Sequence, residues 1–278
     1  MLELAIRAAR EAGHILAEKY NQPHEINVKG LRDISTEADL AAEAVALRLI
    51  REGCPDACVV SEESNSAWQD CGDSPTWYVD PLDGTTNYAR GLPTFSVSVA
   101  MARRGKVECG AVYDPLLEQL FYAERGQGAY LNDERLHVSA RGMLAESLIL
   151  LDWPRVPALR EAAVRLLSRL APQVDAVRSR GSAALAFCAV AAGWAEAYFQ
   201  FTLGPWDVAA GALLVEEAGG RVTGLRSQPP VPPIQSGAIG GQSPIDSIGD
   251  QPYVLSQPDW LATNGLVHEA VLANRPYE

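Results

Sequence analysis

Residues 76–87, TWYVDPLDGTTN, join an apolar run to a turn that carries two aspartates. TWYV is an apolar run that predicts a buried strand, and the proline after Asp80 ends that strand because it lacks a backbone donor. Asp83 and Gly84 form a turn signal, since glycine tolerates positive φ. The two carboxylates are three residues apart around a tight bend. They can therefore converge on one point, with the Leu82 carbonyl between them.

Two further acidic clusters lie at the ends of predicted elements. Residues 61–63, SEE, follow a predicted strand at 57–60, and Asp207 opens an alanine-rich helix. Carboxylates and carbonyls are hard oxygen ligands that suit Mg²⁺, and they would repel one another without a cation. The backbone N–H groups and hydroxyls of 84–86 could hold a phosphate if a helix begins there. Together these features predict metal-assisted hydrolysis of a phosphate ester.

Each acidic cluster also has an ordinary structural explanation when it is taken alone. An isolated DxxDG sequence is usually a surface turn, and an acidic pair is usually a solvated face. An aspartate at the start of a helix is often a capping residue. These explanations weaken because all three clusters fall at element ends in one chain.

Length and composition are typical of a globular protein. The chain has 278 residues, of which 47% are hydrophobic and 21% charged. This predicts a single domain over 1–278, with halves at about 1–142 and 143–278. The formal net charge of −12 disfavours nucleic acid and membrane partners, although bound cations would still admit a small anionic substrate.

The cysteines and the N-terminus indicate the cellular location. Five cysteines are an odd number for a disulfide framework, and Cys54 and Cys58 lack the second pair that a zinc site needs. Residues 1–20 carry charges throughout, unlike a signal peptide, and the apolar stretch at 183–195 is too short to span a bilayer. We therefore expect free thiols and a cytoplasmic location.

Hydrophobic periodicity predicts helices that alternate with strands, as in α/β layers. The helices are expected at 2–20, 35–52, 157–170, 182–192 and 205–220, with a strand and a helix within 260–273. In the helix at 35–52, the residues expected to form the buried face are Leu40, Ala44, Leu47 and Ile50.

Strands are expected between these helices, and the block 95–139 fits an antiparallel sheet. The predicted strands are 57–60, 76–79, 95–102, 106–113, 118–124, 135–139, 146–151, 175–178 and 195–201. Residues 226–252 are rich in proline, glycine and serine, which predicts a loop insertion.

Several separated motifs resemble one known family. WYVDPLDGTTNYARGLPTFSVSVA (77–100) is similar to the first signature of the inositol monophosphatase family, within the lithium-sensitive, magnesium-dependent phosphatases. PWDVAAGALLVEEAGG (205–220) is similar to its second signature, and 33–39, 61–64 and 110–132 resemble further family blocks. The resemblance covers nearly the whole chain in the same order. It implies the layered α/β/α/β/α sandwich of the inositol monophosphatase and fructose-1,6-bisphosphatase type, commonly a homodimer.

The resemblance also implies a role for individual residues. The implied ligands of two, and up to three, Mg²⁺ ions are Glu62, Asp80, Leu82 through its carbonyl, Asp83 and Asp207. The implied catalytic residues are Glu62, with Asp39 and Thr85 orienting the attacking water. The implied substrate contacts are Asp83, Gly84, Thr85, Gly181, Ser182, Ala183, Gln200 and Asp207.

Other side chains are expected nearby. Glu63 should support the metal ligands from behind, and Lys29 lies in a loop similar to one that carries a third metal, unless it is simply solvated. Arg155 and Arg178 are either surface arginines or contacts for a second anion of the substrate. Gln200 stands where the family often has a glutamate that binds a substrate hydroxyl, which leaves the substrate open.

The implied function is a Mg²⁺-dependent phosphomonoesterase that uses a metal-activated water on a small phosphorylated metabolite. Inositol monophosphate or a related sugar phosphate is the first candidate. A 3′(2′),5′-bisphosphate nucleotide, fructose 1,6-bisphosphate and NADP are alternatives. An alternative of another class is a regulatory binding protein with the same fold.

Overall fold

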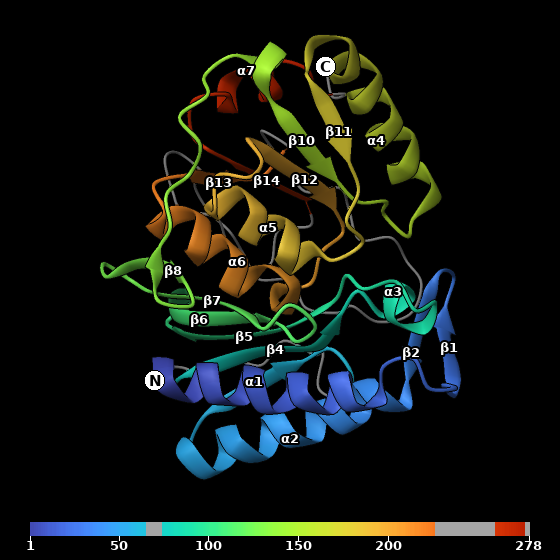
Figure 1. The fold of residues 1–278 in the computed structure, drawn as a ribbon, viewed down its shortest axis with the longest axis vertical. Helices are drawn as coiled ribbons and strands as arrows, with labels where there is room; N and C mark the ends of the chain where they lie inside the picture. The colour runs from blue at the N-terminus through green and yellow to red at the C-terminus, as the bar shows by residue number, and fades with distance from the viewer. Residues whose placement is uncertain (65–73, 226–258, 276–278) are drawn as a thin grey trace.

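The computed structural model describes residues 1–64, 74–225 and 259–275. Two helices cover a seven-stranded sheet, two more helices lie between this sheet and a five-stranded sheet, and further helices cover the outer face (Figure 1). This arrangement is the α/β/α/β/α sandwich that the resemblance implied. The predicted insertion at 226–252 lies outside the described residues.

The outermost helix layer consists of α1 (Leu2–Lys19) and α2 (Glu37–Gly53), both at predicted positions. The predicted buried face of α2 is half wrong, because Leu40 is 55% exposed and Ala44 is also exposed. The helix is instead turned so that Asp39 and Glu43 point inward with the apolar residues. These two carboxylates find hydrogen-bond donors inside the protein, which offsets the cost of burying them.

The seven-stranded sheet has the order β3-β4-β5-β6-β7-β8-β9. Its strands are β3 (Cys58–Ser61), β4 (Thr76–Asp83), β5 (Ser96–Arg103), β6 (Lys106–Asp114), β7 (Gln119–Glu124), β8 (Gly128–Leu131) and β9 (Glu134–Arg135). All neighbours are antiparallel except β3 and β4, which run parallel with Ser61 opposite Val79. Because these two strands end at the same edge, the residues that follow β3 lie beside Asp80.

The strand predicted at 135–139 is wrong. Of the predicted range only Arg135 belongs to a strand, β9, which pairs with β8, and the ladder ends at this residue. The backbone N–H of Val138 donates to the carbonyl of Ala218 at the end of α6, so this segment leaves the sheet. A contact with a helix 80 residues later overrides the local β pattern.

Two buried helices, α5 (Ala183–Ala191) and α6 (Pro205–Glu217), form the central layer. They pack closely, because a Cβ on Gly211 would lie 2.5 Å from Cβ of Phe187. The five-stranded sheet above them has the order β11-β10-β12-β14-β13. Its strands are β10 (Leu148–Leu151), β11 (Ala176–Arg178), β12 (Ala197–Phe201), β13 (Arg221–Thr223) and β14 (Asp259–Thr263).

The remaining elements cover the edges. The outer helices are α4 (Pro157–Leu170) and α7 (His268–Leu272), with 3₁₀ turns at Leu144–Glu146 and Ala171–Gln173. A hairpin of β1 (Ile26–Gly30) and β2 (Asp33–Thr36) stands beside α3 (Thr85–Ala89) (Figure 1). The sequence did not predict this hairpin, because every residue of β1 is exposed and no burial pattern marks it.

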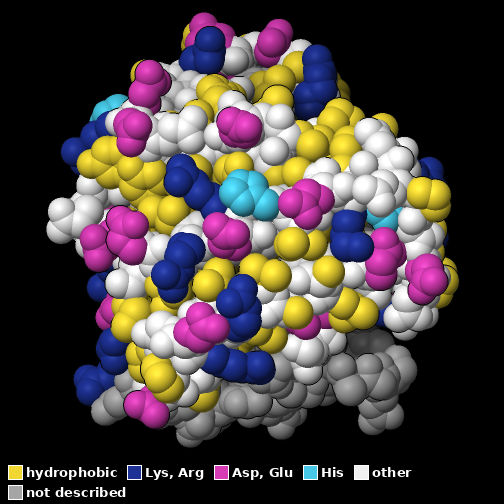
Figure 2. Space-filling view, turned by 60° about the horizontal axis from the view of Figure 1, so that its bottom comes forward, with side chains coloured by type: hydrophobic (Ala, Val, Ile, Leu, Met, Phe, Trp, Pro, Cys, Tyr) yellow, Lys and Arg dark blue, Asp and Glu magenta, His cyan; other side chains and the backbone are white. Residues whose placement is uncertain are grey.

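The surface of the molecule carries charges of both signs. On the face shown in Figure 2, basic and acidic side chains are interspersed with hydrophobic ones. No helix in the described ranges is long and apolar enough to cross a membrane. Cys54, Cys109 and Cys188 are free, but Cys58 is disulfide-bonded, so the expectation of free thiols is wrong at that residue.

Candidate functional site

Three of the acidic residues that the sequence singled out meet at one edge of the seven-stranded sheet. Glu62, Asp80 and Asp207 each offer a carboxylate oxygen, and these atoms all lie within 4.8 Å of one another. Glu62 is placed by its backbone N–H, which donates to the carbonyl of Val79 at 3.2 Å. Asp207 lies in the first turn of α6, where its Oδ2 accepts from the Gly204 N–H at 2.6 Å. The parallel pairing of β3 with β4 and the packing of α6 on this sheet therefore assemble the cluster.

Asp83 lies nearby but is turned toward the start of α5. Its Oδ2 accepts from the Ser182 hydroxyl at 2.5 Å and from the Ala184 N–H at 2.8 Å. Its Oδ1 accepts from the Ala183 N–H at 3.1 Å. Ser182 and Ala183, which were predicted as substrate contacts, thus bind the carboxylate of Asp83, which was predicted as a metal ligand. Asp83 is not one of the three clustered carboxylates.

Burial and the charges of neighbouring carboxylates raise the pKa values of the buried aspartates at this site. Burial, with the nearby charges of Glu62 and Asp83, raises the pKa of Asp207 to about 7. Burial also raises the pKa of Asp83 to about 6, and burial with the surrounding carboxylates raises the pKa of Asp80 well above its usual value. A divalent cation would remove this repulsion, so the donor set fits a hard metal ion such as Mg²⁺.

Asp39 and Thr85, predicted to orient water, are in contact. Oδ1 of Asp39 accepts from the Thr85 hydroxyl at 3.2 Å, and Oδ2 accepts from the backbone N–H and the hydroxyl of Thr36 at 2.8 and 2.6 Å. The Thr85 hydroxyl also lies 3.1 Å from the carbonyl oxygen of Leu82. Burial raises the pKa of Asp39 to about 6. Asp39 is thus held from both sides by α2 and by the turn after β4.

The turn after β4 requires glycine. Gly84 has φ of +102°, and a Cβ there would lie 3.0 Å from the carbonyl oxygen of Thr94 and 3.1 Å from that of Gly181. Asn87 holds the turn close to the same two segments, because its side-chain amide donates to the carbonyls of Thr94 and Arg180 at 2.7 and 2.9 Å. The turn is therefore fastened to the loop that leads into α5.

Basic side chains of the hairpin and of the segment after β10 reach the acidic cluster. Nζ of Lys29 lies 2.7 Å from Oε1 of Glu63 and 3.4 Å from Oε1 of Glu62. Arg155 lies 3.0 Å from Oδ1 of Asp33 and 3.8 Å from Oε1 of Glu62. Burial raises the pKa of Glu63 to about 7, although Lys29 opposes this.

The other predicted candidates are less directly placed. Arg178 is exposed, and its guanidinium donates to the carbonyl of Val177 at 2.8 Å. Gln200 is buried in β12, where its Oε1 accepts from the N–H of Phe201 at 3.1 Å. Gln200 shares a face of β12 with Tyr198, which looks toward the central helices.

Two buried carboxylates whose contacts lead to this site, Glu43 and Asp152, were not predicted from the sequence. Oδ1 of Asp152 accepts from the Ser179 hydroxyl and the Gly181 N–H, both at 2.7 Å, and so fixes the loop before α5. Asp152 directly follows the predicted strand at 146–151, which is the same signal that marked Asp80. Glu43 follows Asp39 by one helical turn, and that spacing is the signal that could have found it.

Asp83→Asn is expected to lower the free energy of unfolding of the metal-free protein by about 1–3 kcal/mol. The new amide would have to place an NH₂ group against N–H donors of α5, because both carboxylate oxygens of Asp83 are acceptors here. Urea denaturation measures this cost. The control is Asp80→Asn, which keeps its acceptor for the Leu82 N–H and should show no such loss. Equal stabilities of the two variants would contradict the assigned contacts of Asp83.

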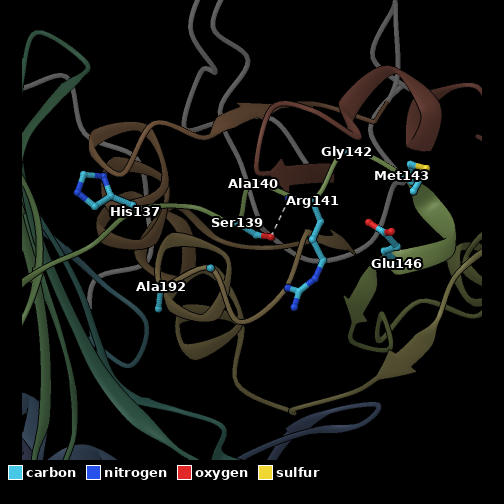
Figure 3. A pocket seen from close by; sticks show the side chains of 9 residues that line it. His137, Ser139, Ala140, Arg141, Gly142, Met143, Glu146 and Ala192 are labelled. Carbon is cyan, nitrogen blue, oxygen red and sulfur yellow. Dashed lines mark hydrogen bonds between the residues drawn. The ribbon is translucent and has the colours of Figure 1, made fainter.

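A separate groove of about 630 Å³ lies between the end of the seven-stranded sheet and β10. Figure 3 shows its lining, which combines the charged Arg141 and Glu146 with small residues such as Ala192. Arg141 is held by the buried Glu196 at 3.2 Å. The residues singled out by the sequence are absent from this lining, so the acidic cluster is the candidate site.

Comparison with known proteins identifies the family of the chain. The profile of the inositol monophosphatase family matches residues 1–269. Nus factor SuhB of Pasteurella multocida (strain Pm70) is 41% identical over 225 residues, which cover 80% of this chain and 84% of that protein.

Solved structures show the same fold. An IMPase of Thermotoga maritima has a TM-score of 0.82 and 30% identity, covering 98% of this chain and 95% of that chain. SaIMPase-II with inositol monophosphate bound has a TM-score of 0.77 and 26% identity, covering 98% of this chain and 92% of that chain. The match of the family profile to nearly the whole chain decides the assignment: the chain belongs to the inositol monophosphatase family.

Proposed function

We propose that this chain is a Mg²⁺-dependent phosphomonoesterase that acts on a small phosphorylated metabolite, with inositol monophosphate or a related sugar phosphate as the first candidate. The observation that carries the proposal is the meeting of Glu62, Asp80 and Asp207 within 4.8 Å, beside the Gly84 turn. Membership of the family supports phosphatase activity. The inositol monophosphate bound to SaIMPase-II supports the substrate class.

The proposed metal ligands are Glu62, Asp80 and Asp207, with Asp83 and the Leu82 carbonyl as further ligands. We expect two, and up to three, Mg²⁺ ions per site. When bound, Mg²⁺ acidifies a water molecule and neutralises the phosphoryl oxygens. The hard oxygen donors and the raised pKa values of the buried carboxylates support this choice of ion.

The protein groups around the cluster suit water attack on phosphorus. The Thr85 hydroxyl donates to Asp39, so the lone pairs of the Thr85 oxygen stay free to accept a hydrogen bond from a water molecule. Thr36 holds Asp39 in the orientation that this needs. The backbone N–H groups of Gly84 and Thr85 are proposed to bind the phosphate, at the positive end of α3.

The proposed contacts for the rest of the substrate lie at the start of α5 and on β12. They are Gly181, Ser182, Ala183 and Gln200. Glutamine binds a hydroxyl as a neutral partner, so the chain should accept more than one sugar phosphate. Arg155 lies at the exposed rim next to Glu62, where a second anion of a substrate could reach it.

Phosphate release tests the proposed function. The substrates are inositol 1-phosphate, fructose 1,6-bisphosphate, adenosine 3′,5′-bisphosphate and NADP, each with and without Mg²⁺. We expect inositol 1-phosphate to be hydrolysed fastest, with inhibition by Li⁺ and loss of activity on chelation. Full activity after exhaustive chelation would overturn the metal mechanism. Faster hydrolysis of another ester would show that inositol monophosphate is not the preferred substrate.

A second candidate is a regulatory binding protein of this fold, favoured by relatives that are called Nus factor SuhB. Affinity capture with the full chain tests it, when parent protein and Asp80→Asn are compared. A partner retained equally by both, together with no phosphate release from any substrate, would favour this candidate. We also propose a homodimer, which light scattering would measure.

A further inference from the structure

Glu43 is a buried carboxylate that the proposed metal chemistry does not use. It lies in the middle of α2 and is 4% exposed. Burying a carboxylate is costly unless strong hydrogen bonds compensate for the lost water. Its position on the inner face of a helix that packs on β4 therefore requires an explanation.

Within the part of the chain that the structure describes, the side chain of Glu43 accepts hydrogen bonds from one short segment. Its Oε1 accepts from the Ser61 hydroxyl, from the Glu63 N–H at 3.3 Å and from the Ser64 N–H at 3.1 Å. The donors flank Glu62 on both sides. One carboxylate oxygen thus gathers the turn that follows β3, and Glu62 lies at the centre of that turn.

α2 links this turn to the water-orienting pair. Asp39 precedes Glu43 by four residues, so the two carboxylates lie on the same side of the helix, one turn apart. Asp39 binds Thr85 in the turn after β4, while Glu43 binds the turn after β3. One rigid helix therefore fixes the spacing between the two turns that carry the proposed site.

We propose that Glu43 is a positioning residue that sets the metal affinity of the site by holding Glu62 toward Asp80 and Asp207. The proposal rests on the proposed metal function. A charged acceptor makes hydrogen bonds about twice as strong as a neutral one. Glu43→Gln keeps the shape of the side chain but loses this charge, so Glu62 would have to be ordered when the metal binds. Loss of such support typically weakens metal binding by about 10–100-fold.

The experiment measures Mn²⁺ binding to the full chain by calorimetry, together with the Mg²⁺ dependence of phosphate release. We compare Glu43→Gln, Ser61→Ala, which removes one of the donors, and Glu52→Gln. The last is the control, because Glu52 is an exposed glutamate on the same helix that pairs with Arg48 at 3.5 Å. We expect the Mn²⁺ dissociation constant to rise about 10–100-fold in Glu43→Gln, less in Ser61→Ala and not at all in the control.

A structural role alone would lower stability and leave metal affinity unchanged. We therefore expect the turnover of Glu43→Gln to approach that of the parent at saturating Mg²⁺. The variant should, however, need a higher Mg²⁺ concentration to reach half of its maximal turnover. Parental Mn²⁺ affinity in Glu43→Gln overturns the proposal. If that variant does not fold, unchanged affinity in Ser61→Ala overturns it. If the parent itself binds no Mn²⁺, the proposed function fails and the role of Glu43 with it.

Discussion

Asp80→Asn is expected to lower phosphate release by about three orders of magnitude while the protein stays folded. Asp80 is 1% exposed, shares a hydrogen bond with Asp207 and has a carboxylate oxygen within 4.8 Å of those of Asp207 and Glu62. The substitution removes a charge from the donor set that would hold Mg²⁺. An asparagine resembles the neutral acid, so it should also reduce the repulsion in the metal-free cluster. Steady-state phosphate release at saturating Mg²⁺ measures the effect.

The matched control makes the same chemical change elsewhere. Asp133 lies in an exposed turn between β8 and β9, so Asp133→Asn should leave phosphate release unchanged. In urea denaturation without metal, Asp80→Asn should be as stable as the parent or more so. Turnover within a few-fold of the parent in Asp80→Asn would remove Asp80 from the proposed metal site.

Mg²⁺ is expected to stabilise the protein more at pH 8 than at pH 5. The folded metal-free protein holds Asp39 and Asp83 with pKa values of about 6 and Asp207 with a pKa of about 7. These values lie above the ordinary 3.8, so the folded state binds more protons than the unfolded state between about pH 4 and 7. Stability without metal therefore falls as the pH rises through this window.

One buried group acts in the opposite direction. Burial lowers the pKa of His268 to about 4, so the unfolded state takes up its proton first as the pH falls below about 6.5. This contribution to stability is present above pH 6.5 and lost in acid. The pKa of the partly exposed Glu37 is also lowered, by its hydrogen bonds to His24 and to backbone N–H groups, and acts in the same direction as that of His268. Since the raised pKa values belong to several fully buried carboxylates, we expect these carboxylates to dominate without metal.

Thermal unfolding with and without Mg²⁺ at the two pH values tests the balance. Mg²⁺ must displace protons from the cluster at pH 5 but meets ionised carboxylates at pH 8, so the increase in melting temperature should be larger at pH 8. His268→Gln removes the opposing titration and should steepen the loss of metal-free stability with pH. A Mg²⁺ shift that is equal at both pH values would contradict this account.

Local pattern was sufficient for most of the elements. The predicted places are correct for the helices at 2–20 and 157–170 and for strands such as 106–113. The spacing of apolar residues along the sequence indicates which face of a helix, or which whole strand, is buried. The acidic clusters were visible for the same reason. A carboxylate directly after an apolar run stands at the end of a strand, whatever the partners of that strand are.

Contacts between residues far apart in the sequence determine which polar side chains are buried and which way they point, and the local sequence pattern does not predict either. Leu40 was expected on the buried face and is exposed. Glu43, which was not among the residues expected to be buried, is buried because donors 18 to 21 residues further along the chain satisfy its carboxylate. Asp83 is turned to the start of α5 by donors about 100 residues away.

The α/β layers, the family and the identity of the clustered acids Glu62, Asp80 and Asp207 could be predicted from the amino-acid sequence alone. Which buried carboxylates bind protein donors, and which face one another, became known from the folded structure. Hydrophobic period measures how much of a side chain is buried. It carries no information about the donor that a buried carboxylate will meet, and that donor fixes the direction in which the carboxylate points.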